Sequence, residues 1–395
     1  MRKIAIVALL FVSQSASAIP FSFDARTLGM GGVGVATADL GAASWANPAM
    51  MTRHGMHDEF SVLVGAGAFI RDDDDLIGDI EDYQDADDRR KDALDSGDNV
   101  ALARALTDMR AAIRNTDDKV LAPELTLLFA IGRAFESFSM GLSVRADEIA
   151  GGLVTNLSCE LTDPGCDPNE LTNENFNILV LEGVRSTEFG LTFAKDFTWF
   201  DRRVSIGVKP KIVALDAFTY SESLSSIDVD IDIRNDEETD TSIGSFETVD
   251  LGLAIDLADN WLLGLNLRNL ITDDFDVSGQ TLNFDTEARI GVAYTHPWVT
   301  VGLDYDLTEN EPLLIGDAFD NLTTQYIALG AEFRASDYAA LRIGASKNLA
   351  DDITGGARDI RYTAGVGFWF GFNLDLAFVL SDHSLGGTLQ TGFRF

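Results

Sequence analysis

The stretch Phe372-Asn373-Leu374-Asp375-Leu376-Ala377-Phe378-Val379-Leu380 decides the fold of this chain. Large apolar side chains take every second position, and mostly small or polar side chains lie between them. Successive side chains of a strand point to opposite faces, so this period of two predicts a strand with one apolar face. Val249–Leu257 and Val299–Leu307 repeat the pattern. The chain is therefore predicted to be built from strands.

Strand length and connections distinguish a membrane barrel from a soluble β-sandwich, which also alternates. Most runs have about 9–11 residues, as a tilted bilayer-spanning strand requires. Soluble strands average about 5–6 residues. We predict an all-β fold, a transmembrane antiparallel up-and-down β-barrel of about fourteen strands, with the strands at 59–69, 120–131, 138–147, 176–196, 203–220, 246–257, 261–270, 284–295, 298–307, 325–334, 338–347, 361–370, 372–381 and 387–395.

The connections between these strands alternate in length. Short links are expected at 132–137, 198–202, 258–260, 296–297, 335–337 and 371. Long links are expected at 70–119, 148–175, 221–245, 271–283, 308–324 and 348–360. Short periplasmic turns opposite longer extracellular loops are typical of outer-membrane barrels. An even strand number places both barrel ends on the short-turn side.

Both termini carry features of an exported precursor. Arg2 and Lys3, the apolar run Ile4–Val12 and the small residues Ala16-Ser17-Ala18 predict a signal peptide, 1–18, cleaved after Ala18. The alternative is a buried N-terminal strand. At the other end, Phe393 and Phe395 share one face of the last strand, which resembles the signal that outer-membrane precursors present to the barrel assembly machinery. An ordinary last strand is the alternative. We expect a location in the outer membrane of a Gram-negative bacterium, in contact with its lipid.

Composition agrees with this class. The 395 residues include 35 Gly and 25 Phe but only 8 Pro, a balance typical of all-β proteins. The net charge of −35 disfavours nucleic acid as a partner, since both would be anionic. Aromatic residues near the expected short turns suit the headgroup level of a membrane, namely Phe197, Trp199, Phe200, Trp261, Trp298, Trp369 and Phe370. Packing of these rings in a core is the alternative.

Residues 19–57 precede the first strand and form a segment of small residues. Ala25 to Ala36 reads Ala-Arg-Thr-Leu-Gly-Met-Gly-Gly-Val-Gly-Val-Ala, and Asn47-Pro48-Ala49 follows. This pattern resembles the start of the FadL family of long-chain fatty acid transporters and their PorV-like relatives, and the acidic sequence looks like the subgroup labelled conjugal transfer protein TraF. The resemblance implies a fourteen-stranded barrel, 58–395, whose lumen is plugged by an N-terminal hatch, 19–57.

The resemblance also implies function. An outer-membrane channel for uptake of hydrophobic compounds is expected, with Asn47, Pro48 and Ala49 bordering the substrate pathway and Gly31, Gly32 and Gly34 in the hatch. Alternatively, these glycines and Pro48 only shape the plug. A second hypothesis is a barrel accessory to conjugative transfer or secretion, without transport activity. The inward face is expected to be polar, with Asp250, Asp256, Arg268, Glu287, Arg289, Asp304, Asp306, Arg342, Arg361 and Asp375.

Three loop features have alternative interpretations. Link 70–119 is acidic, and its apolar spacing from about Asp85 to Arg114 predicts a helix or helical pair on the outer rim. Its role is either a solvated surface cap or a gate. Cys159 and Cys166 predict a disulfide in an exported protein; metal or redox chemistry would need more ligands. Asp228–Asp232 either binds calcium or forms a solvated acidic loop.

An enzyme is the least supported class. The chain has four His and no Gly-x-Ser-x-Gly elbow. We also find no phosphate loop, zinc spacing or dinucleotide fingerprint, so no cofactor or metal is expected. An outer-membrane hydrolase stays the third hypothesis. Oligomeric state does not follow from the sequence.

Overall fold

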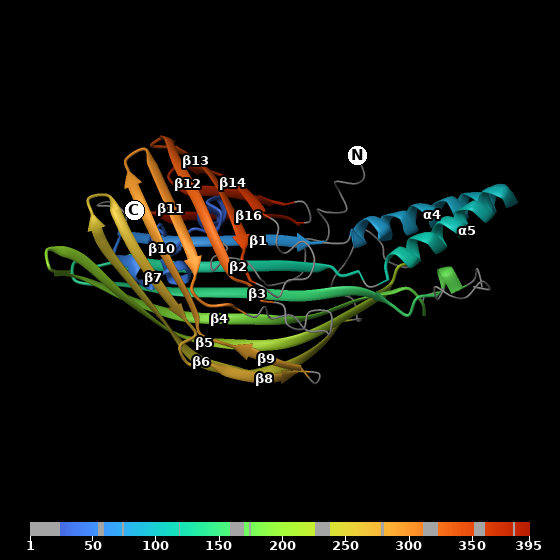
Figure 1. Ribbon diagram of the computed structural model, residues 1–395, viewed down its shortest axis with the longest axis horizontal. Coiled ribbons are helices and arrows are strands. Elements are labelled where there is room, and N and C mark those ends of the chain that lie inside the picture. The colour runs from blue at the N-terminus through green and yellow to red at the C-terminus, as the bar shows by residue number, and fades with distance from the viewer. Residues whose placement is uncertain are drawn as a thin grey trace.

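The chain folds into a single closed barrel of fourteen antiparallel strands, as the alternating pattern predicts (Figure 1). The computed structural model describes residues 24–53, 59–72, 75–117, 119–158, 170–173, 175–225, 238–277, 280–310, 323–350, 360–381 and 384–395. Neighbouring strands follow chain order, and β1 pairs with β16 to close the ring. Closure satisfies every strand edge, which a sheet in lipid requires.

The barrel strands are β1 (Phe60–Arg71), β2 (Ala122–Ala134), β3 (Ser139–Thr155), β4 (Ile178–Trp199), β5 (Arg202–Ser223), β6 (Glu238–Ala258), β7 (Trp261–Arg268), β10 (Glu287–His296), β11 (Val299–Asp306), β12 (Tyr326–Ser336), β13 (Ala339–Asn348), β14 (Ile360–Trp369), β15 (Asn373–Leu380) and β16 (Ser384–Arg394). A separate two-stranded sheet, β8 (Asp273–Val277) and β9 (Gln280–Phe284), is not part of the ring of hydrogen-bonded strands. Each of the fourteen predicted strands is present. Most boundaries are shifted by a few residues, but β3 ends and β6 begins eight residues beyond the predicted boundary, toward the long-loop rim.

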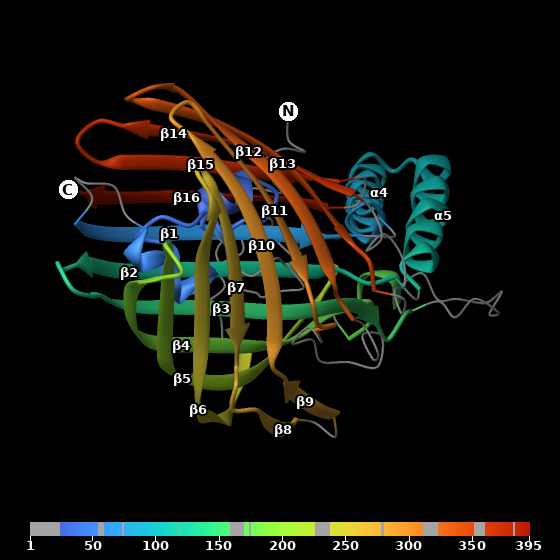
Figure 2. The same ribbon diagram turned by 60° about the vertical axis from the view of Figure 1, so that its left-hand side comes forward.

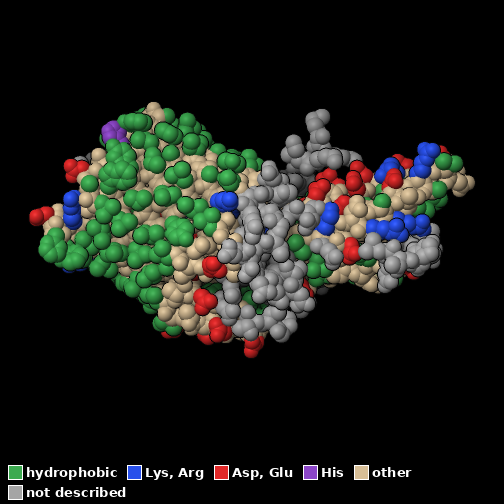
Figure 3. All heavy atoms as spheres, viewed as in Figure 1, with side chains coloured by type: hydrophobic (Ala, Val, Ile, Leu, Met, Phe, Trp, Pro, Cys, Tyr) green, Lys and Arg blue, Asp and Glu red, His purple; other side chains and the backbone are tan. Residues whose placement is uncertain are grey.

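The wall alternates between an apolar outer face and an inner face of small and polar residues. On β15, Phe378 and Leu380 are exposed, whereas Asp375, Ala377 and Val379 are buried. Apolar side chains cover the outside of the strands, and charged side chains gather beyond the long-loop end (Figure 3). An apolar outer band is the surface that lipid contacts.

The two rims differ as the sequence predicts. One carries the short turns 135–138, 200–201, 259–260, 297–298, 337–338 and 370–372. We identify this rim as periplasmic, because short turns lie on that side in outer-membrane barrels. Exposed rings gather there as expected, namely Phe197, Trp199, Phe200, Trp261, Trp298 and Phe370. Trp369 is an exception, because it is partly buried and lines a cavity inside the rim.

The chain ends meet at the same rim. Phe60 and Phe395 exchange two backbone hydrogen bonds, of 2.7 and 3.0 Å between nitrogen and oxygen. Their ring centroids lie 5.1 Å apart. Phe393 and Phe395 are both exposed on the outer face, as the alternation predicts.

The opposite, extracellular rim is extended by strands and helices. Strands β4, β5 and β6 have 22, 22 and 21 residues, about twice the length that crosses a bilayer. Two helices, α4 (Leu76–Ser96) and α5 (Asn99–Asn115), form the predicted helical pair and project from this rim (Figure 1). The first helix begins earlier than the predicted residue 85, because Asp72 accepts hydrogen bonds from the amides of Leu76 and Ile77.

The predicted loop 271–283 is wrong in one respect, because it contains β8 and most of β9 (Figure 2). Among the described residues, no helix is long and apolar enough to cross a membrane. The expected signal peptide, Cys159, Cys166 and Asp228–Asp232 lie outside the described residues.

Candidate functional site: the hatch and the lumen

The barrel interior is filled near the periplasmic rim by residues 24–53, the described part of the expected hatch 19–57, and the name hatch refers below to these residues. The hatch contains α2 (Ala25–Gly29), α3 (Ala43–Ala46) and a 3-10 turn, η2 (Pro48–Thr52). Almost every hatch residue is buried, although the segment has too few large side chains to form a core of its own. The hatch is therefore held by the wall.

Glycines shape the first half of the hatch. Gly31 and Gly32 have φ values of +75° and +93°, a region that favours glycine. A Cβ atom at Gly31 would also lie within 3.0 Å of backbone atoms of Ala345 and Leu329 in the wall. Gly34 packs against Thr27 and Ala46 within the hatch. A side chain at Gly31 or Gly32 would therefore strain the hatch backbone.

Asn47 connects two parts of the hatch with the wall. Its amide nitrogen donates to Val35 O at 2.8 Å and to Leu253 O of β6 at 3.1 Å. Its oxygen accepts from the amide of Ala49 at 3.0 Å. Pro48 occupies the first position of the turn that Asn47 caps, where its missing amide hydrogen is no loss. Asn47 is completely buried, so all its polar atoms depend on these partners.

The wall receives the hatch backbone through glycines. A Cβ at Gly330 of β12 would lie under 3.0 Å from the backbone of Met30, and one at Gly252 of β6 would meet Asn47 and Ala49 equally closely. Three other glycines of the wall meet the hatch backbone in the same way, namely Gly207, Gly264 and Gly344, whereas Gly302 meets the side chains of Val33 and Thr37. The missing side chains allow backbone to touch backbone, which closes the lumen at this level.

Ion pairs anchor the periplasmic side of the hatch. Arg26 contacts Glu332 of β12 through two nitrogen–oxygen pairs of 2.8 and 3.1 Å. Glu332 also accepts from Arg342 at 2.9 Å, and Arg342 donates to Asp375 at 2.6 Å. Burial alone would lower the pKa of Arg26, but Glu332, Asp39 and Asp24 together outweigh burial and raise the pKa above its usual value. Arg26 therefore stays charged.

A second anchor ties the end of the hatch to β5 and β6. Arg53 donates to Asp256 at 2.5 Å and to Ser205 Oγ at 2.9 Å. The hydroxyl oxygens of Thr52 and Ser205 lie 2.7 Å apart. Arg203 donates to Thr52 O at 2.5 Å.

Buried carboxylates hold the middle of the hatch. Asp304 of β11 accepts from the amides of Gly34 and Val35 at 2.8 and 2.9 Å. Arg289 of β10 donates to Gly32 O at 3.3 Å and forms a bidentate pair with Asp306. The hatch is thus fastened by hydrogen bonds and ion pairs, which are non-covalent and reversible.

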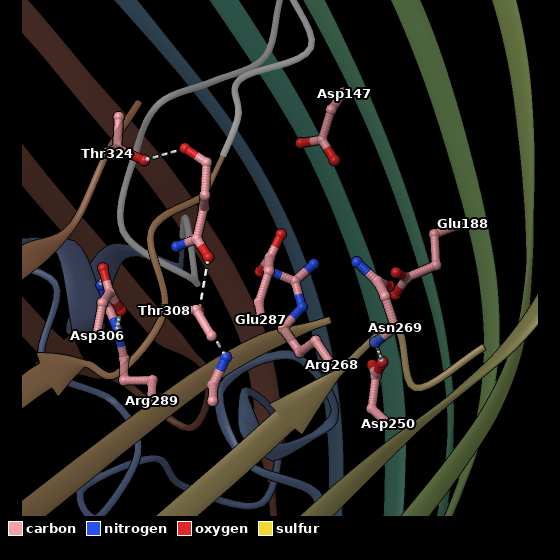
Figure 4. Close-up of polar contacts among 12 residues, drawn as sticks. Asp147, Glu188, Asp250, Arg268, Asn269, Glu287, Arg289, Asp306, Thr308 and Thr324 are labelled. Atoms are coloured by element: carbon pink, nitrogen blue, oxygen red, sulfur yellow. Dashed lines mark hydrogen bonds and ion pairs between the residues drawn. The ribbon is translucent and has the colours of Figure 1, made fainter. Parts of the chain in front are cut away.

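Charged side chains line the lumen wall on the extracellular side of the hatch (Figure 4). Lys209 and Lys211 of β5 both contact Glu188 of β4, and Lys211 lies 3.0 Å from Asp250 of β6. Arg268 pairs with Glu287 at 3.1 Å. We call these six residues the charged belt. Their charges pair across neighbouring strands, so the belt stiffens the wall.

An apolar patch lies further toward the extracellular rim. Val184, Val213, Leu215 and Phe246 of β4–β6 are buried with Val277, Leu282 and Phe284 of the β8–β9 hairpin. The rings of Phe246 and Phe284 have centroids 4.9 Å apart. The belt therefore separates this apolar patch from the hatch.

Below the hatch, a cavity of about 670 Å³ opens inside the periplasmic rim. Its walls come from the hatch and from the periplasmic ends of β7 and β10–β16. We call this cavity the vestibule.

Most inward charges were predictable from alternation, and the structure buries Asp250, Arg289, Asp304, Asp306, Arg342, Arg361 and Asp375. Asp256, Arg268 and Glu287 are partly buried on the same inner face. Five further charged residues were not predicted to be part of the site, namely Glu188, Lys209, Lys211, Glu332 and Arg26. Period two in β4 and β5 places Glu188, Lys209 and Lys211 on the inner face and could have identified them.

Comparison with known proteins identifies the family. A family model described as the F plasmid transfer operon TraF protein matches residues 44–306, well over half of the chain. The chain belongs to the TraF family. None of the curated proteins compared with this TraF-family chain matches it.

Solved structures share the fold at low identity. The Pseudomonas putida toluene transporter TodX has a TM-score of 0.57 and 11% identity, and the match covers 95% of this chain and 99% of TodX. The Ralstonia pickettii toluene transporter TbuX scores 0.55 at 12% identity, over 95% and 99% of the two chains. A Pseudomonas aeruginosa FadL homologue scores 0.52 at 11%, over 96% and 100%. The FadL-like barrel predicted from the hatch motif is confirmed, and its closed, apolar-walled architecture belongs to the outer membrane.

Proposed function

We propose that this TraF-family barrel is an outer-membrane channel for hydrophobic compounds, closed in the present state by its hatch. The proposal depends on how the hatch is held, because residues 24–53 fill the lumen through reversible contacts with the wall. The shared fold with TodX, TbuX and the FadL homologue supports the same conclusion, because those proteins are named as toluene transporters and as a FadL homologue.

Passage requires the hatch to move, since its backbone touches the wall at the glycine positions. Asn47 is the proposed latch, because its amide joins Val35 and Ala49 of the hatch to Leu253 of β6. Releasing it frees the turn Pro48–Thr52 from β5 and β6. Asn47, Pro48 and Ala49 would then border the opened pathway, and Gly31, Gly32 and Gly34 give the hatch its shape.

A reversible disulfide tests this proposal. The Oγ atoms of Thr52 and Ser205 are 2.7 Å apart, so Thr52→Cys with Ser205→Cys places two sulfurs within bonding reach. Proteoliposomes containing the oxidised double variant should admit a hydrophobic fluorescent probe more slowly than wild type, and reductant should restore the rate. Each single-cysteine variant is a control for pairing with the native cysteines. Equal rates for oxidised and reduced double variant would contradict the proposal.

Export and assembly follow from the same proposal. We expect the signal peptide to be removed after Ala18, so that mature protein begins at Ile19, which N-terminal sequencing of the purified membrane form measures. The barrel assembly machinery and outer-membrane lipid are the expected partners of the folding chain. A mature protein that begins elsewhere would change the hatch boundary without affecting the barrel.

The helical pair favours a second candidate, a contact role in conjugation or secretion. Tyr83 of α4 donates to Leu171 O at 2.6 Å, and Leu76, Met109 and Ile113 pack with it against the barrel rim. The pair is thus a firmly seated projection beyond the membrane. Deleting residues 76–115 should leave probe uptake unchanged if it is a surface cap. Loss of plasmid transfer with normal uptake would favour the accessory role.

A further inference from the structure

Arg361, on the inner wall of the barrel, lacks the carboxylate partner that other arginines inside the barrel have. It stands one position inside the extracellular end of β14 and is only 9% exposed. Within the described part of the chain it forms no ion pair, and its Nη2 atom is buried without a hydrogen-bond partner. The charge of Arg361 is therefore buried but not paired. Four other arginines inside the barrel each pair with a carboxylate, namely Arg26, Arg268, Arg289 and Arg342.

Two aromatic rings lie beside Arg361 in place of a carboxylate. Its guanidinium carbon lies 4.3 Å from the ring centroid of Tyr326 on β12 and 5.8 Å from that of Phe69 on β1. Asp306, which accepts a hydrogen bond from the Tyr326 amide at 2.7 Å, is already paired with Arg289. Cation–π attraction offsets only part of the free energy that burial of a charge costs. The guanidinium is therefore less stable in this position than it would be in water.

The first half of the hatch covers one side of Arg361. The arginine lines a cavity of about 10 Å³ together with Leu28 and Gly31 of the hatch. Such a volume is close to the smallest that holds one water molecule. Thr363, two positions further along β14, donates to Gly29 O at 3.2 Å. Withdrawal of this part of the hatch would therefore open one side of Arg361 to water.

We propose that Arg361 is a positioning residue whose buried, unpaired charge raises the free energy of the closed hatch and so keeps the hatch close to opening. Opening hydrates the guanidinium, whereas closure removes its water without supplying a carboxylate. The contacts of the hatch hold the closed state against this electrostatic cost, so the equilibrium between closed and open hatch is easier to shift. The inference rests on the proposed function, because it concerns the opening that passage of a solute requires.

Supplying the missing carboxylate tests this role in the full chain in lipid nanodiscs. Ser346 of β13 lies directly opposite Arg361, lines the same small cavity and is buried. Directly opposite side chains share a face with Cβ atoms about 5 Å apart, so Ser346→Asp places a carboxylate beside the guanidinium. Hydrogen exchange of the amides of residues 28–34 reports opening of the hatch. Exchange should be about tenfold slower in Ser346→Asp than in Ser346→Asn, its uncharged match in size.

Removing the charge should act in the same direction as pairing it. Arg361→Met keeps most of the side-chain volume, and the same amides should exchange about threefold more slowly than in wild type. Arg342→Met provides the contrast, because it takes a paired arginine from Glu332 and Asp375 and should speed exchange. If Arg361 only held the hatch in place, Arg361→Met would also speed exchange, and that result would overturn the proposal.

The double variants make the test independent of packing. In the Arg361→Met background, Ser346→Asp buries a carboxylate without a partner, so exchange should become faster than with Ser346→Asn. This reversal of sign requires an interaction between charges, and an equal effect of Ser346→Asp in both backgrounds would overturn the proposal. If the Arg361→Met chains do not fold, as judged by heat-modifiable gel mobility, the comparison of Ser346→Asp with Ser346→Asn in the native background still decides: equal exchange rates would overturn the proposal.

Uptake of the hydrophobic probe separates this inference from the proposed function. Ser346→Asp should slow uptake in parallel with hatch exchange. Slower exchange with an unchanged uptake rate would support the role of Arg361 and contradict the channel, because exchange measures opening without transport.

Discussion

Replacing Asn47 with alanine should unlatch the hatch without unfolding the barrel. The substitution removes three hydrogen bonds, two donated to Val35 O and Leu253 O and one accepted from Ala49 N. At about 1 kcal/mol each, their loss costs the closed state about 3 kcal/mol. A tenfold change in an equilibrium constant corresponds to about 1.4 kcal/mol, so the ratio of open to closed hatch should rise about 100-fold.

Hydrogen exchange of hatch amides measures this ratio, because exchange requires local opening. Amides of residues 43–53 should exchange about 100-fold faster in Asn47→Ala, while those of β1–β3 keep their protection. Uptake of the hydrophobic probe should rise in parallel. Asn175→Ala, in an exposed extracellular loop, provides the control. Unaltered hatch exchange would refute the role of Asn47 as a latch.

Three further predictions concern the hatch contacts and the last strand. Arg26→Gln and Glu332→Gln should each loosen the hatch. A double-mutant cycle on hydrogen exchange of the hatch amides should give a coupling free energy of about 1.5–3 kcal/mol. Additive effects would mean that the ion pair does not hold the hatch. Gly330→Ala should displace Met30 and make the hatch accessible to protease, whereas Gly65→Ala, whose Cβ has no neighbour closer than 3.6 Å, should not. Phe395→Ala should lower the yield of folded barrel in outer-membrane fractions, as judged by heat-modifiable gel mobility; a wild-type yield would remove Phe395 from the assembly signal.

The ring of strands was predictable because membrane strands are long and strictly alternating. The alternation of apolar residues shows which side chains share one face of a strand, as in Val299–Leu307 and Phe372–Leu380. The short turns between strands determine which neighbouring strands pair. The β8–β9 hairpin was missed because five-residue strands are too short to cross a bilayer. Its Phe275, Val277, Leu282 and Phe284 alternate, but only the wall at Phe246 explains why they are buried.

The contacts of the hatch were much less predictable. The motif around Gly31 and Asn47 indicated a plug, but no local pattern links Asn47 to Leu253 or Arg26 to Glu332, which lie 206 and 306 positions apart. Such pairs depend on barrel curvature and strand register. The vestibule is likewise assembled from the ends of eight strands and from the hatch, so no single stretch of sequence predicts it.

The amide of Ala25 donates to the Gln390 side chain, across 365 positions of sequence. The hatch is synthesised first in the mature chain, but this contact to the wall forms only once β16, the last strand, is present. Until β16 pairs with β1, the wall around the hatch is incomplete, so the hatch lacks part of the surface against which it packs. A chain truncated before its final strand would therefore neither close the barrel nor seat the hatch, and it would be sensitive to protease. A seated hatch thus indicates that the whole chain was synthesised.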